Sequence, residues 1–181
     1  MTARRVVLAL LAVPAAALVV DRWLAVRRGP NPPLAMDMLA VVDAPIEDTW
    51  AVVADIPRQP EWMHDMKRVT IETPGPVRPG TRAEATVRIL GIAVSDPVEI
   101  TGLEPPHRFT VRHEGLFTGD GVITLQEGAD GTTTIVRWRE TLVPPILPEL
   151  GARVQAPILT RVFQDDLHRL KRLVETGAAH G

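Results

Sequence analysis

Apolar positions along residues 34–176 follow two spacings. A spacing close to the helical period follows the first strand and returns near the C-terminal end, and a period of two lies between them. Residues 36–42 predict a first strand. A short helix then begins at Pro45, because proline suits the first helical position, and its apolar face places Trp50 in the core. Prolines end this helix, and residues 61–66 are predicted as a second short helix or a turn.

The middle of the chain predicts a run of strands separated by glycine and proline turns. In the clearest of them, alanine, valine and isoleucine alternate with charged or polar residues over residues 82–89. The glycine-rich segment 128–131 predicts a tight turn. The expected strands after the second helix cover residues 67–71, 82–89, 98–100, 107–114, 119–126 and 132–142.

A long C-terminal helix is predicted after the prolines that end the last strand. Its apolar stripe starts with Val154, Ile158 and Val162, and Gly177 is a natural stop before a flexible tail at 177–181. Strands in one run with helices at the ends indicate an α+β domain. We therefore expect a curved antiparallel sheet of about seven strands wrapped around this helix, with an apolar pocket where the helix leaves the concave face uncovered.

The N-terminal segment predicts a membrane helix. Fifteen uncharged, mostly apolar residues, 6–20, follow an arginine pair, and counting on to residue 26 gives enough length to span a bilayer. We therefore predict a single-pass anchor in residues 1–28, a membrane location, and a proline-rich linker over 29–33. A cleaved signal peptide is the alternative, and the side of the membrane is left open.

Composition narrows the function classes. The chain has 181 residues and no cysteine, which excludes disulfides and thiolate chemistry. Five of its 20 basic residues but only one of its 22 acidic residues lie in residues 1–33, so the domain that follows is acidic. An acidic domain repels phosphate backbones, which argues against nucleic acid as a partner. No metal-ligand spacing or phosphate loop is present, so no metal and no cofactor are predicted.

Two segments resemble a known superfamily. VVDAPIEDTWAVVADIPRQPEWM at residues 41–63 and DGTTTIVRWRETL at residues 130–142 are similar to the opening and the last strand of START-like (SRPBCC) proteins, particularly the polyketide cyclase/dehydrase-like branch. The resemblance covers residues 34–176 and implies a helix-grip fold. It implies a role among lipid carriers, hormone receptors or aromatic cyclases, without choosing one of them.

Strand alternation brings two titratable side chains to the inward face. His113 shares a face with Phe109 and Val111, and Glu140 shares one with Trp138. In the strand order that the resemblance implies, the two strands flank residues 119–126, so the pair can approach across small glycines. We predict His113 and Glu140 as a candidate acid–base pair, with a structural role as the alternative. His168, Asp165 and Asp166 are instead expected to be solvated charges on the last helix.

The main hypothesis is a membrane-tethered module that binds a hydrophobic small molecule or lipid. An enzyme of the aromatase/cyclase or dehydratase type using His113 and Glu140 is the alternative, and a non-binding structural module with a filled core is a third reading. Oligomeric state is left open. The predicted pocket residues are Trp62, Met63, Met66, Ala85, Val87, Phe109, Val111, Val136, Trp138, Val154, Ile158, Val162 and Phe163.

Overall fold

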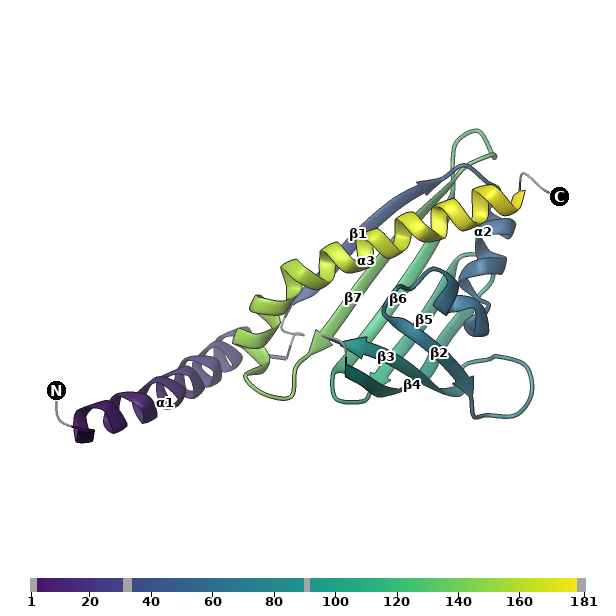
Figure 1. Ribbon diagram of the computed structural model, residues 1–181. Coiled ribbons are helices and arrows are strands. Elements are labelled where there is room, and N and C mark those ends of the chain that lie inside the picture. The colour runs from purple at the N-terminus through teal and green to yellow at the C-terminus, as the bar shows by residue number, and fades with distance from the viewer. Residues whose placement is uncertain (1–2, 31–33, 90–91, 179–181) are drawn as a thin grey trace.

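The computed structural model describes residues 3–30, 34–89 and 92–178. It contains the predicted α+β arrangement, a curved antiparallel sheet with a long C-terminal helix (Figure 1). The helices are α1 (Ala3–Arg28), α2 (Ile46–Val53), the 3-10 helix η1 (Ile56–Glu61) and α3 (Pro148–Ala178). The strands are β1 (Ala35–Val42), β2 (Met66–Ile71), β3 (Arg82–Ile89), β4 (Ile92–Glu104), β5 (Arg108–Glu114), β6 (Thr118–Glu127) and β7 (Thr134–Val143).

The sheet has seven strands in the order β1-β7-β6-β5-β4-β3-β2. Strands β2 to β7 therefore form a continuous meander, and β1 crosses over to pair with β7. Every pairing is antiparallel. Such a sheet has one face for the core and one for solvent, which explains the clean alternation of buried and exposed residues along β1.

Helix α3 runs along β1 and covers the edge of the sheet (Figure 1). The side-chain amide of Gln164 bonds to both backbone groups of Leu39, accepting from its N–H at 3.2 Å and donating to its carbonyl at 2.9 Å. Lys171 donates to the carbonyl of Val41 at 2.7 Å. These contacts occupy backbone groups that an edge strand otherwise leaves open to pairing with another chain.

The turn alternative predicted for residues 61–66 agrees with the structure, because η1 ends at Glu61, turn residues follow, and β2 begins at Met66. One local prediction differs from the structure. Strand β4 begins at Ile92, well before the predicted residues 98–100, and it runs through Pro97. Proline is accepted there because Pro97 pairs only with β3, and pairing with β5 begins at Val98.

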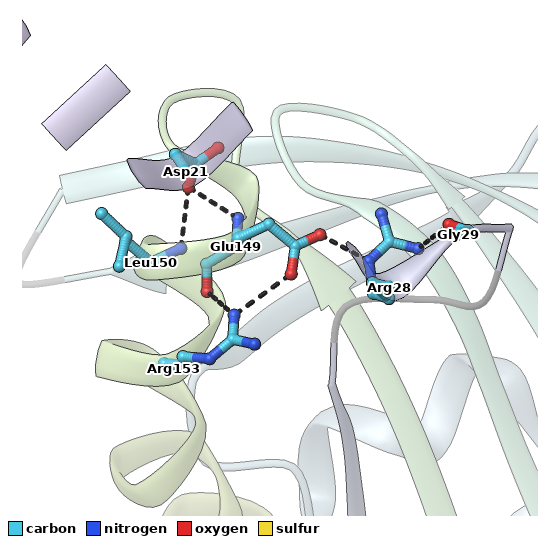
Figure 2. Close-up of polar contacts among 6 residues, drawn as sticks. All are labelled: Asp21, Arg28, Gly29, Glu149, Leu150 and Arg153. Carbon is cyan, nitrogen blue, oxygen red and sulfur yellow. Dashed lines mark hydrogen bonds and ion pairs between the residues drawn. The ribbon is translucent and has the colours of Figure 1, made fainter. Parts of the chain in front are cut away.

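The N-terminus of α3 is bonded to α1 (Figure 2). Asp21 of α1 accepts hydrogen bonds from the backbone N–H groups of Glu149, at 2.9 Å, and Leu150, at 2.8 Å. The buried carboxylate of Glu149 is paired with Arg28 and, at 3.1 Å, with Arg153. Burial alone raises a carboxyl pKa, but the bonds from the two arginines outweigh it and lower the pKa of Glu149.

Asp21 caps α3 although it lies far away in the sequence, because its side chain satisfies N–H groups that have no partner inside the helix. Asp21→Ala is expected to lower the free energy of unfolding by about 0.5–2 kcal/mol. Asp120→Ala, which removes an exposed carboxylate 3.6 Å from Arg112, is the control and is expected to change it by less than about 1 kcal/mol. Urea denaturation measures both values, and equal losses would contradict the capping role.

No helix in the described part of the chain is both long enough and apolar enough to cross a membrane. This finding does not support the anchor predicted over residues 6–26. The side chains of residues 6–13, which belong to that prediction, lie outside the described part, where α1 is known only as a helical backbone.

Candidate functional site

A cavity of about 650 Å³ lies between the sheet and α3. Its walls are mainly aliphatic and aromatic side chains from the inner face of the sheet and from one side of α3. The side chains of the domain therefore do not fill its interior. The hypothesis of a structural module with a filled core required that they did. Ten of the predicted pocket residues line the cavity: Met63, Met66, Ala85, Val87, Phe109, Val111, Trp138, Ile158, Val162 and Phe163.

Three predicted pocket residues do not line the cavity. Trp62 and Val136 are fully buried in the core, where Trp62 packs edge-on against Trp138 with ring centroids 6.0 Å apart. Val154 is 71% exposed. Each helical residue turns about 100°, so Val154 points away from Ala152 and Ala156, which are buried. The apolar stripe of α3 is therefore centred further round the helix than the sequence pattern predicted.

A polar cluster interrupts the apolar wall. The ring of His113 on β5 lies between two carboxylates, with Nδ1 2.7 Å from Oδ2 of Asp96 and Nε2 3.1 Å from Oε1 of Glu140. The other oxygen of Glu140 accepts a hydrogen bond from the indole N–H of Trp138 at 2.8 Å. Three strands, β4, β5 and β7, thus contribute to one site, and all four side chains line the cavity.

Glycines on β6 let the cluster form across that strand. His113 pairs with Gly119, and Gly121 pairs with Glu140, so no side chain stands between the imidazole and the carboxylate. A Cβ at Gly121 would lie 2.5 Å from Oε2 of Glu140. Gly119 has a φ of +149°, and a Cβ there would lie 1.8 Å from the carbonyl oxygen of Thr141. Gly119 therefore requires glycine, and a side chain at Gly121 would displace the carboxylate of Glu140.

The two carboxylates set the charge of the imidazole. Burial alone lowers a histidine pKa, but the hydrogen bond to Asp96 and the close negative charges of Asp96 and Glu140 outweigh it and raise the pKa of His113 to about 10. His113 is therefore an imidazolium at neutral pH. In this state it donates hydrogen bonds and does not act as a general base. One imidazolium and two ionised carboxylates together give the cluster a net charge of −1.

A further carboxylate reaches the cavity from α3. Asp166 is only 3% exposed, and its Oδ1 accepts the backbone N–H of His64 at 2.9 Å. Burial raises the pKa of Asp166 to about 6. The expectation of a solvated charge is thus wrong for Asp166, because the helix face that carries it turns toward the cavity. The same expectation agrees with the structure for Asp165 and His168, whose side chains are more than half exposed.

Asp96 is the functional-site residue that the sequence reasoning missed. Asp96 and its neighbour Pro97 precede the strand predicted over residues 98–100, so Asp96 was not assigned to a strand face. A usable signal was present nevertheless, since Asp96 continues the two-residue period of Val98 and Ile100 toward the N-terminus. In the structure all three side chains line the cavity.

A family model described as polyketide cyclase/dehydrase and lipid transport matches residues 35–175. The chain belongs to this family. The match covers nearly the whole of the sheet and α3, and so it includes every residue of the polar cluster. The START-like, polyketide cyclase/dehydrase-type resemblance noted in the sequence is confirmed. No curated protein matches the sequence significantly.

Solved structures share the fold at low identity. A Deinococcus radiodurans protein is 24% identical, with a TM-score of 0.61 over 80% of this chain and 98% of its own. A Thermus thermophilus protein is 16% identical, with a TM-score of 0.64 over 80% and 99%. The Zhui aromatase/cyclase of a Streptomyces species is 16% identical, with a TM-score of 0.64 over 78% and 93%. At these identities the likeness extends to the fold alone.

Proposed function

We propose that this family member binds a hydrophobic small molecule, such as a lipid or a polyketide-like compound, in the cavity under α3. The observation that carries the proposal is the cavity itself, whose volume of about 650 Å³ is in the range of small-molecule sites. Moving an apolar ligand from water to these mainly apolar walls is favourable by about 25 cal/mol of free energy per Å² of buried apolar area. The polar cluster supplies the few convergent polar groups that orient such a ligand.

Filling the cavity is expected to abolish this binding. Leu159 of α3 is half-buried and lines the cavity, so Leu159→Trp places an indole in the ligand's space. We expect the dissociation constant of the neutral fluorescent probe N-phenyl-1-naphthylamine to rise about 100-fold or more. Val154→Trp is the matched control, because Val154 lies on the same helix, is 71% exposed and does not line the cavity.

The titration is read from the probe's emission, with circular dichroism to verify that both variants fold. Val154→Trp is expected to bind as the wild-type protein does. If the wild-type protein does not bind the probe, or if both variants bind it equally well, the proposal is wrong. Native mass spectrometry of protein purified from its own host adds a second readout, in which a co-purifying ligand mass is expected for the wild type and absent for Leu159→Trp.

A cyclase/dehydratase-type enzyme is the second candidate, and the position of His113 favours it. An imidazolium on the cavity wall can protonate a hydroxyl leaving group, while Glu140 accepts a proton from the neighbouring carbon of a β-hydroxy ketone. The products are an enone and water. Against this, a pKa of about 10 makes His113 a weak acid, which suits hydrogen bonding better than proton transfer. Enone absorbance distinguishes the two, since an enzyme loses turnover in His113→Gln.

A further inference from the structure

Two polar atoms at the cavity wall have unused hydrogen-bonding capacity. Nε2 of His113 and Oε1 of Glu140 are both buried, and neither has a hydrogen-bond partner within the described residues. They are 3.1 Å apart, close enough for an ion pair, but they are not aligned for a hydrogen bond with each other. Buried polar atoms that lack partners are uncommon in folded proteins, and here both lie where a ligand fits.

The remaining atoms of both side chains are already occupied. Nδ1 of His113 is held by Asp96 at 2.7 Å, and Oε2 of Glu140 is held by the indole N–H of Trp138 at 2.8 Å. These bonds fix the ring and the carboxylate, so the two free atoms stay side by side without the ligand. One is a donor and the other an acceptor, because an imidazolium carries hydrogen on both nitrogens and a carboxylate only accepts.

We propose that the ligand carries a neutral hydroxyl group on an apolar body, and that His113 Nε2 and Glu140 Oε1 bind this hydroxyl together. The inference rests on the proposed binding function and assigns the ligand's chemical class. A hydroxyl oxygen accepts from Nε2–H while its hydrogen is donated to Oε1, so both free atoms are satisfied by one small group. Alcohols, phenols and enols all meet this requirement.

Other head groups satisfy the site less well. A ketone accepts from His113 but leaves Oε1 of Glu140 without a hydrogen-bond donor, and a buried acceptor that lacks a donor weakens binding. An ammonium group donates to Glu140 but is repelled by the imidazolium. A carboxylate adds a third negative charge beside Asp96 and Glu140, with His113 as the nearest cation in the cluster. The polar cluster therefore disfavours the carboxylate of a free fatty acid, and the other basic side chain that lines the cavity, Arg88, is not one of its members.

The test compares three ligands with the same twelve-carbon chain, 1-dodecanol, 2-dodecanone and dodecanoate, as competitors of N-phenyl-1-naphthylamine at neutral pH. We expect the alcohol to bind about tenfold or more tightly than the ketone, because the ketone provides no hydrogen-bond donor for the buried Oε1 of Glu140. The carboxylate is expected to bind most weakly. Equal affinities, or tightest binding of the carboxylate, would overturn the inference while probe binding still supports the cavity.

Two variants separate hydrogen bonding from charge. Glu140→Gln keeps the side-chain size but presents an amide, and it is expected to reduce the preference for alcohol over ketone about tenfold. Asp96→Asn removes one negative charge but leaves Oε1 of Glu140 in place, so it is expected to weaken the exclusion of dodecanoate and retain the alcohol preference. If Glu140→Gln does not fold, the wild type and Asp96→Asn still decide the matter. A lost alcohol preference in Asp96→Asn with unchanged dodecanoate exclusion contradicts the assignment.

Discussion

Trp62→Ala is expected to lower the free energy of unfolding by about 3–5 kcal/mol, because it leaves a large cavity in the core. The Trp62 side chain is fully buried, and its ring meets Trp138 edge-on at a centroid distance of 6.0 Å. The ring of Trp138 in turn packs against that of Phe163 of α3, with the two ring centroids 4.8 Å apart. Removing Trp62 therefore loosens the aromatic packing between the sheet and the helix. A loss of this size lowers the melting temperature by roughly 6–20 °C.

Two other substitutions make the experiment specific. Trp23→Ala removes the same side chain from α1, where Trp23 is 50% exposed and contacts Arg27 at 4.0 Å, and we expect a loss of about 1 kcal/mol or less. Trp62→Phe keeps an aromatic ring and removes a buried indole N–H that has no hydrogen-bond partner among the described residues. It is expected to cost much less than Trp62→Ala. Calorimetry that finds Trp62→Ala no worse than Trp23→Ala contradicts the packing described for the core.

The free energy of unfolding is expected to fall as pH rises from about 6.5 to about 10, the two values between which His113 titrates in the unfolded and folded protein. Below this window both states hold the proton and the stabilisation is complete. Within it only the folded state retains the proton, so stability falls by up to about 1.4 kcal/mol per pH unit. Above about 10 the folded protein loses the proton as well, and the contribution of His113 is gone.

Few other side chains of this sequence titrate in the upper part of this pH range, so the effect of His113 can be separated from theirs. The chain has no tyrosine and no cysteine, and its lysines are Lys67 and Lys171, so few other side chains titrate between pH 8 and 10. The titratable groups that line the cavity with His113 are Asp65, Arg88, Asp96, Glu140 and Asp166. Burial raises the pKa of Asp166 only to about 6, which lies below the window.

His113→Gln is the control for the pH experiment. It leaves the buried carboxylate of Glu140 and the partly buried carboxylate of Asp96 without their shared cation, so we expect a loss of about 3–5 kcal/mol at neutral pH. The variant lacks the titrating ring, and its stability should stay nearly flat over the window in which the wild-type stability falls. Urea denaturation at closely spaced pH values follows both proteins. Parallel curves for the two would show that His113 is not held protonated by its neighbours.

Some of the site was predictable from local pattern. The period of two along β5 and β7 placed His113 and Glu140 on the inward face, because successive strand residues point to opposite sides of the sheet. The same rule placed Ala85 and Val87 on the cavity wall. On α3 the pattern was less reliable, since its stripe of apolar residues extends to exposed Val154.

Other features depended on which strands become neighbours. Asp96 is 17 residues from His113 in the chain, and it was hidden by a proline that is tolerated only because of how β4 pairs. Trp62 follows a short 3-10 helix, and nothing local states whether its indole faces the cavity or the core. The contact between Asp21 and the start of α3 joins residues more than 120 positions apart.

The sequence by itself determined the elements, the inward faces of the strands and the family, because backbone periodicity and turn residues act over a few positions. Only the tertiary structure decided that a cavity remains under α3, and that Asp96, His113 and Glu140 meet at its wall. It also decided the charge of that site, since the proton on His113 is held by carboxylates from two other strands. Charge states of buried groups depend on distances in space, which the order of residues along the chain does not contain.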